Sequence, residues 1–225
     1  KAGAFDLSVA CSGFVYALAV ADQMVGSGAM ERVLVIGADT LSRVTNWHDR
    51  GTCILFGDGA GAAVVGPVAD GSGVLSFDLG SDGAGADLLC IPGGGGRKPG
   101  SAFDLTHEEC CIHMDGRQVY RFAVSTIGES ALKALEKAGL GAGDVSLFIP
   151  HQANLRIIEG AARRLELPME RVLVNVDRYG NTSNASIPLA LWEARRDGRL
   201  KSGDVVVVVG FGGGLAWASA VIRWT

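Results

Sequence analysis

The sequence lacks the features that mark membrane-spanning, secreted and nucleic-acid-binding proteins. No apolar run approaches the roughly 18 residues that a membrane-spanning helix needs, and the first residues do not form a basic and apolar signal segment. The formal net charge is only −4, which gives no reason to expect a nucleic acid or a membrane surface as a partner. We therefore expect a cytoplasmic protein that binds neither.

The cysteines do not have the spacing of a metal site or of a disulfide framework. There are five, an odd number, and no CxxC pair occurs. Cys110 and Cys111 are adjacent, which makes them a poor structural disulfide. We therefore expect reduced thiols and no bound metal. Gly59 and Gly61 do not form a dinucleotide-binding loop, because a third glycine is missing and a strand follows.

What the sequence does contain is enough apolar material for a large core. It has 225 residues, of which 48% are hydrophobic, and its 33 glycines stand between apolar runs. The apolar patterns predict strands and helices over most of the chain. The strands are expected at residues 4–10, 32–38, 61–66, 74–78, 145–150, 172–176, 204–210 and 216–224, and the helices at residues 13–27, 117–138, 154–165 and 187–198.

The predicted elements repeat in one order. Strand, polar turn, helix, strand, glycine turn and strand occur once from residue 4 and again from residue 172. The second copy has further elements in front of it, so a matching first copy would lack its opening strands and helices. Continuous β-branched strands between helices predict mostly parallel sheets that are covered on both faces. We assign residues 1–70 to the remainder of an N-terminal half and residues 71–225 to a C-terminal half.

A cysteine lies where a predicted strand meets a predicted helix. Cys11 follows the first strand and precedes a helix that is apolar on every side. The N-terminus of that helix would favour the thiolate and lower the cysteine pKa from its usual value of about 8.5. Cys11 is therefore a candidate nucleophile, and the alternative is a buried structural cysteine.

Two further polar side chains lie at similar junctions. His151 follows the strand at 145–150, and functional sites gather at the carboxyl ends of strands in parallel sheets; the alternative is a structural histidine. Asn181 lies in the turn that corresponds, by the duplication, to the Cys11 turn; the alternative is a helix cap. The glycines at 212–214 would let the backbone approach a ligand closely, or would only form a tight turn.

Six motifs together resemble those of the β-ketoacyl-acyl-carrier-protein synthase III family of thiolase-fold condensing enzymes. They run in the family's order and spacing along the whole chain. They are ACSGF at 10–14, DRGT at 49–52, FGDGAGAA at 56–63, PHQANLRI at 150–157, GNTSNAS at 180–186 and FGGG at 211–214.

The resemblance implies an α/β protein with a duplicated αβαβα fold of five layers, whose N-terminal half is incomplete here. It also implies a reaction. Cys11 would take an acyl group from acyl-CoA, and malonyl-acyl-carrier-protein would then lose carbon dioxide and condense with that group. His151 and Asn181 would donate hydrogen bonds to the malonyl thioester oxygen, and the backbone N–H groups of Cys11 and Gly213 would form the oxyanion hole.

Comparison with related families favours the type that starts fatty-acid chains. A thiolase would have a second cysteine where this chain has Phe211, and the elongating synthases have a second histidine where this chain has Asn181. Ser12 and Asn184 occupy positions where small residues are commoner in the family. The alternatives are a related acyltransferase of secondary metabolism and a non-catalytic fragment.

The resemblance also implies the binding partners. Acyl-CoA would be a substrate rather than a cofactor, and no other cofactor is expected. Arg50 and Asn154 match positions that contact CoA, and the chain would form a homodimer. Four basic residues would contact acyl carrier protein, unless they only form a solvated helix face: Arg121, Arg156, Arg163 and Arg164.

Overall fold

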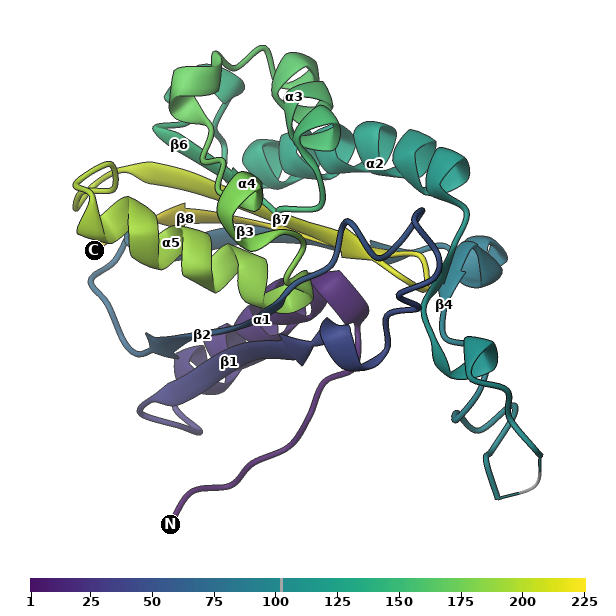
Figure 1. Ribbon diagram of the computed structural model, residues 1–225. Helices are drawn as coiled ribbons and strands as arrows, with labels where there is room; N and C mark the ends of the chain where they lie inside the picture. The colour runs from purple at the N-terminus through teal and green to yellow at the C-terminus, as the bar shows by residue number, and fades with distance from the viewer. Residues whose placement is uncertain (102) are drawn as a thin grey trace.

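The computed structural model describes residues 1–101 and 103–225 and arranges them in four alternating layers of helix and sheet (Figure 1). A four-stranded sheet of order β3-β8-β7-β6 separates helices α2 and α3 from helices α1 and α5. A second sheet, β1-β2, lies on the other side of α1 and α5. The helices are α1 (Gly13–Gly26), α2 (Gly116–Lys137), α3 (Leu155–Arg164), the short α4 (Val176–Tyr179) and α5 (Ser186–Arg196). The strands are β1 (Val33–Thr40), β2 (Asp58–Val65), β3 (Gly73–Ser81), β4 (Leu89–Cys90), β5 (His113–Met114), β6 (Leu147–Pro150), β7 (Val205–Gly212) and β8 (Ala216–Arg223).

Strand β7 is the centre of the core because both of its faces are buried. Val207 and Val209 belong to the cluster formed with α2 and α3, whereas Val206 and Val208 belong to the cluster formed with α1 and α5. Every residue of β7 is buried, so its sequence is a continuous apolar run rather than an alternating one. This run of valines positions the glycine turn that follows it.

The α/β class is confirmed, but the expectation of mostly parallel sheets is wrong. Among the strand pairs of the described residues, only β6 and β7 are parallel; β1-β2, β3-β8, β4-β5 and β7-β8 are antiparallel. A strand that is buried on both faces has the same apolar pattern in either direction. The pattern therefore reported the burial of the strands and not their direction.

Two of the expected strands are absent from the described structure. Residues 4–10 are mostly exposed and form no strand pairing there, and a 3-10 helix, η1 (Ala10–Ser12), begins at the end of this segment. In residues 172–176 only Val172 makes an isolated parallel bridge, to Phe148, and α4 begins at Val176. Both segments have the apolar composition of a strand. A strand also needs a neighbouring strand whose backbone N–H and C=O groups are free to pair with its own.

The predicted duplication is present from the first turn onward. The order η1, α1, β1, β2 recurs as η7 (Ser183–Ala185), α5, β7, β8, and both copies end in an antiparallel strand pair. Four of the five expected layers are present, and Leu34, Ile36 and Val64 are exposed on the outer face of β1-β2. The division of the chain at residue 70 stays a prediction.

The buried aromatic residue of β6 provides a test of the core. Phe148 has no exposed surface and lies in the cluster between α2, α3 and the sheet. We expect Phe148→Ala to lower the free energy of unfolding by about 3–5 kcal/mol, because it removes apolar contacts and leaves a cavity. Urea unfolding measures this change. The control Leu132→Ala, on an α2 side chain that is 40% exposed, should change it by less than about 0.5 kcal/mol; equal changes would contradict the assignment of the core.

Candidate active site

The three candidate side chains line one cavity, although they come from distant parts of the chain. Cys11, His151 and Asn181 meet at the end of β7, together with Phe211 and Gly212. The cavity has room for about 70 Å³, several times the volume that one water molecule needs. The rest of its wall is mainly apolar and comprises Leu55, Phe56, Leu89, Met114, Gly116, Val119, Tyr120, Ala153, Asn154 and Ile157.

The backbone around Cys11 is constrained on both sides. Ala10 has φ +44°, a left-handed conformation that costs a residue with a Cβ on the order of 1–3 kcal/mol. On the other side, a Cβ at Gly212 would lie 2.8 Å from the Cys11 nitrogen and 3.3 Å from its Sγ. Only glycine permits this approach. The end of β7 and the Cys11 turn therefore determine each other's position.

The expectation of a lowered pKa for Cys11 is wrong. Burial raises the pKa of the Cys11 thiol to about 11, and the nearby Asp39 carboxylate also raises it, while a hydrogen bond from Ser183 lowers it. The Asp39 carboxylate accepts a hydrogen bond of 2.5 Å from Asn184 Nδ2. The removal of the thiol from water thus outweighs the hydrogen bonds that favour the thiolate. In the resting protein Cys11 is therefore a neutral thiol at neutral pH.

His151 is neutral as well and has one ring nitrogen left for a ligand. Its backbone N–H donates to Val209 O at 2.7 Å, which ties the end of β6 to β7. Burial lowers the pKa of the imidazole to about 3. Nδ1 lies 2.7 Å from Ser186 Oγ. Phe211 packs edge-on against the imidazole, with 5.4 Å between the two ring centroids. Because Nδ1 is engaged, Nε2 is the nitrogen available to the cavity.

The hydrogen bonds around Ser186 favour one tautomer of His151. Ser186 Oγ accepts a hydrogen bond of 3.3 Å from the Gln152 backbone N–H. Its own proton is then free to be donated to His151 Nδ1. In that arrangement the imidazole carries its proton on Nε2 and acts as a hydrogen-bond donor in the cavity.

Asn181 is held so that its amide nitrogen remains free. Its backbone N–H donates to Leu55 O at 2.8 Å, and its carbonyl accepts from Gly57 N–H at 2.9 Å. Its side-chain Oδ1 accepts from Ser183 N–H at 2.9 Å. Ser183 has φ +51°, so this turn, like that of Cys11, contains a left-handed non-glycine residue. Within the described part of the chain no group accepts from Nδ2, which is therefore left to donate to a ligand.

The residues expected to contact CoA are not all beside this cavity. Asn154 lines it and also caps α3, since its Oδ1 accepts from Ile157 N–H at 3.0 Å. Arg50 is exposed in the loop before β2 and does not line the cavity. Gly213, the expected oxyanion donor, follows the cavity residue Gly212 directly.

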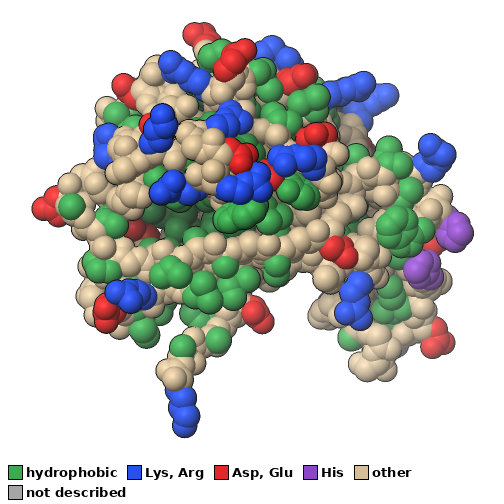
Figure 2. Space-filling view, turned by 60° about the vertical axis from the view of Figure 1, so that its left-hand side comes forward, with side chains coloured by type: hydrophobic (Ala, Val, Ile, Leu, Met, Phe, Trp, Pro, Cys, Tyr) green, Lys and Arg blue, Asp and Glu red, His purple; other side chains and the backbone are tan. Residues whose placement is uncertain are grey.

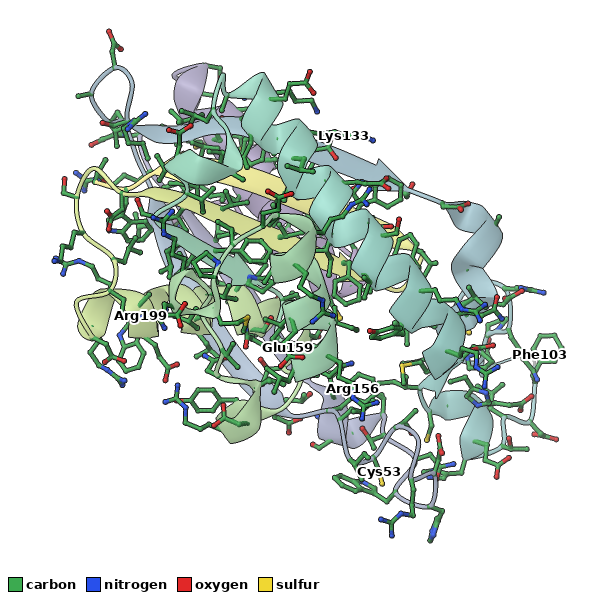
Figure 3. All side chains as sticks on the ribbon, turned by 90° about the horizontal axis from the view of Figure 1, so that it is seen from above. Cys53, Phe103, Lys133, Arg156, Glu159 and Arg199 are labelled. Carbon is green, nitrogen blue, oxygen red and sulfur yellow. The ribbon has the colours of Figure 1, made fainter. Side chains whose placement is uncertain are left out.

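The four arginines expected to contact a carrier protein are all exposed on α2 and α3. Arg156 lies in the first turn of α3, just after the cavity residue Asn154. In Figure 3 it is labelled in the lower central part of the view, apart from Arg199 at the left. Arg164 is partly engaged, because its guanidinium lies 3.5 Å from the Glu129 carboxylate. Lys and Arg side chains alternate with Asp and Glu over the layer that contains these helices (Figure 2).

Two side chains contribute to the site beyond those predicted from the sequence. The first is Ser186, which lies within the GNTSNAS motif. A buried histidine needs a partner at each ring nitrogen, and this requirement could have pointed to Ser186. Phe211 was noted only as a difference from thiolases, yet it lines the cavity beside His151.

Within the described residues, no group of three or more His, Cys, Asp and Glu side chains could hold a metal ion. No helix described here is long and apolar enough to cross a membrane.

Two family models match the chain. The model of 3-oxoacyl-[acyl-carrier-protein] synthase III matches residues 5–83, and the model of the synthase III C terminal matches residues 135–224. Relatives described as β-ketoacyl-[acyl-carrier-protein] synthase III are similar over all 225 residues, at 57% identity in Desulfitobacterium hafniense strain DSM 10664 / DCB-2 and at 54% in Clostridioides difficile strain 630. The chain covers 68% of each relative.

Solved structures agree with these relatives. The synthase III of Thermus thermophilus is 52% identical, with a TM-score of 0.91, over 98% of this chain and 68% of that one. A priming β-ketosynthase from the R1128 polyketide biosynthetic pathway is 40% identical, with a TM-score of 0.91, over 99% of this chain and 66% of that one.

The raised pKa of Cys11 predicts a steep pH dependence of its alkylation. With a pKa of about 11, roughly one thiol in ten thousand is ionised at pH 7. The rate of Cys11 alkylation by iodoacetamide should rise about tenfold per pH unit from pH 7 to pH 10, because only the thiolate reacts. Mass spectrometry of the Cys11 peptide measures this rate. A rate that levels off near pH 7 would contradict a neutral buried thiol.

The tautomer of His151 can be measured directly. We expect the ¹⁵N chemical shifts of its ring at pH 7 to show the proton on Nε2. The Ser186→Ala variant should give a mixture of tautomers, because Nδ1 loses its donor. It should also lower the free energy of unfolding by about 1–3 kcal/mol, since a buried polar atom is left without a partner. A proton on Nδ1 in the unsubstituted protein would contradict this assignment.

Proposed function

This chain belongs to the 3-oxoacyl-[acyl-carrier-protein] synthase III family, and on that premise we propose that its cavity performs the condensation that starts fatty-acid synthesis. A starter acyl-CoA, malonyl-acyl-carrier-protein and one proton from solvent give 3-oxoacyl-acyl-carrier-protein, free CoA and carbon dioxide. The observation that supports this proposal most strongly is that Cys11, His151 and Asn181 line one cavity. The chemistry needs a nucleophile and two hydrogen-bond donors, and these are the groups present.

In the first step the acyl group moves from CoA to Cys11. The Cys11 sulfur attacks the thioester carbonyl, the bond from that carbonyl to the CoA sulfur breaks, and the thiol proton leaves with CoA. The product is a neutral thioester in a buried cavity with mainly apolar walls. Such a cavity favours an uncharged intermediate and keeps water away from it. The same burial that raises the pKa of Cys11 thus suits the acyl-enzyme.

In the second step the malonyl thioester loses carbon dioxide. The carbon–carbon bond to the carboxylate breaks, and its electron pair becomes an enolate with negative charge on the thioester oxygen. His151 Nε2–H and Asn181 Nδ2–H donate hydrogen bonds to that oxygen and stabilise the charge. A histidine whose pKa is held near 3 acts as a neutral donor rather than as a base. This matches what decarboxylation needs.

In the third step the enolate carbon attacks the carbonyl of the acyl group on Cys11. A carbon–carbon bond forms, and the oxygen of the tetrahedral intermediate becomes negative. We assign the backbone N–H groups of Cys11 and Gly213 as the donors to this oxygen. The intermediate collapses, the carbon–sulfur bond breaks, and the Cys11 sulfur takes up a proton. This restores the resting thiol.

The remaining binding assignments follow from the same reaction. Arg50 and Asn154 would contact CoA. Arg156 lies in the first turn of α3, two residues after the cavity residue Asn154, and would contact a carrier protein bound there. Arg121, Arg163 and Arg164 would extend that surface along α2 and α3. We further propose a cytoplasmic homodimer without a cofactor, in which acyl-CoA serves only as substrate.

A second candidate reaction has a specific observation in its favour. The similarity to a priming β-ketosynthase of a polyketide pathway is compatible with the same chemistry directed to another carrier protein. The two candidates differ in the carrier protein that accepts the product. Assays with malonyl groups loaded on a fatty-acid carrier protein and on a polyketide carrier protein distinguish them.

Separate assays of the two half-reactions test the proposed function. In the full protein we expect radiolabelled acyl-CoA to label Cys11, and Cys11→Ala to remove the label. We expect His151→Ala and Asn181→Ala to retain labelling but to slow the release of carbon dioxide from malonyl-acyl-carrier-protein by about 10²–10³-fold, the usual cost of losing one oxyanion donor. Labelling that persists in Cys11→Ala would contradict the proposal. A protein that forms neither product would instead be the non-catalytic alternative.

A further inference from the structure

A buried carboxylate that does not line the cavity has no role in the mechanism above. The side chain of Glu193, on α5, is 3% exposed. It accepts hydrogen bonds from Asn175 Nδ2 at 2.8 Å and Tyr179 Oη at 2.7 Å, and two from the Arg178 guanidinium at 2.9 and 2.8 Å. Burial raises the pKa of Glu193, but these hydrogen bonds outweigh it and hold the pKa below its usual range. The group is therefore an ionised carboxylate with its partners in place.

One branch of this network leads to His151. Asn175, whose side chain is bound by Glu193, donates its backbone N–H to Gln152 Oε1 at 2.9 Å. Gln152 Nε2 in turn donates to Pro150 O at 2.8 Å and to Leu173 O at 3.1 Å. Pro150 and Gln152 flank His151 in the sequence. Glu193 therefore supports the backbone on which the imidazole stands.

The other branch leads to Asn181. Arg178 and Tyr179 lie in the last turn of α4, and Gly180 joins them to Asn181. The segment is tightly packed, because a Cβ at Gly57 would lie 2.3 Å from Tyr179 O. A rotation of α4 would therefore move the backbone of Asn181, and Glu193 holds α4 by three of its four hydrogen bonds.

Helix α5 also contacts the imidazole directly, in addition to the branch that runs through Asn175 and Gln152. Ser186 and Glu193 are seven residues apart, which is close to two helical turns, so they lie on one face of α5. Ser186 Oγ is bonded to His151 Nδ1. One rigid helix thus contacts the imidazole at its first turn and the two supporting segments two turns later.

We propose that Glu193 is a positioning residue that holds His151 and Asn181 in a single arrangement toward the malonyl thioester oxygen. This inference rests on the function proposed above. Cys11 is carried by η1 and α1, and none of the hydrogen bonds of Glu193 reaches those elements. Loss of Glu193 should therefore impair the decarboxylation more than the transfer of the acyl group to Cys11.

The test is the ratio of the two half-reactions in the full protein. Glu193→Gln keeps the volume of the side chain but places an amide donor among three donors, so the network loses hydrogen bonds. We expect the release of carbon dioxide from malonyl-acyl-carrier-protein to fall at least about tenfold relative to the rate of Cys11 labelling by acyl-CoA, since small displacements of catalytic groups are costly. Tyr179→Phe removes only one hydrogen bond, and it should cause a smaller loss in the same step. It keeps the proposal testable if Glu193→Gln does not fold.

Asp78→Asn is the matched control. It removes the carboxylate of another ion pair, Lys137–Asp78, which joins α2 to β3 and in which the Asp78 side chain is 11% exposed. It should lower the melting temperature without changing the ratio of the two half-reactions. Equal losses in both half-reactions of Glu193→Gln and Tyr179→Phe, or no loss in either, would overturn the inference and leave the proposed function intact. Failure of the unsubstituted protein to label Cys11 would overturn the proposed function and this inference together.

Discussion

The close approach of the β7 glycine turn to the Cys11 turn is the contact on which the site depends. The absence of a side chain at Gly212 lets the strand end lie against the Cys11 backbone and sulfur. β7 in turn holds the end of β6 through the hydrogen bond from His151 N–H to Val209 O. Cys11 and the His151 imidazole are therefore positioned by one strand, whose valines are buried on both faces. The strand at the centre of the core thus also sets the geometry of the candidate site.

The two titratable groups that line the cavity, Cys11 and His151, are neutral at rest, and the cavity walls are mainly apolar. Burial keeps the proton on Cys11 and off the His151 imidazole, so no permanent charge of these two residues has to be stabilised in the resting state. Charge would arise only during the reaction, on oxygens that face fixed N–H donors. Such donors stabilise a transient negative charge strongly because they are held in place before the charge appears. The left-handed backbone of Ala10 and Ser183 is the strain that accompanies this fixed arrangement of donors.

Much of this arrangement was predictable from local patterns, and the errors have physical causes. The duplicated order of elements and the junction positions of Cys11, His151 and Asn181 could be predicted, because helix ends, strand ends and turns have distinct residue preferences. The direction of the strands could not be predicted, since burial on both faces removes the apolar–polar alternation that distinguishes the two faces of a sheet. The pKa of Cys11 was predicted in the wrong direction because the sequence shows the nearby helix but not the depth of burial. Glu193 was not singled out, because a charged residue in a helix usually faces solvent and its partners Asn175, Arg178 and Tyr179 lie on a different element, α4 and its N-cap.

The most direct measurement of the central claim is a crystal structure of the full protein with an acyl group on Cys11 and a non-hydrolysable malonyl thioester bound. We predict that the thioester oxygen lies about 2.7–3.2 Å from both His151 Nε2 and Asn181 Nδ2, with its reactive carbon facing the acyl carbonyl. A thioester oxygen that contacts neither group, or an acyl group attached elsewhere than on Cys11, would contradict the account.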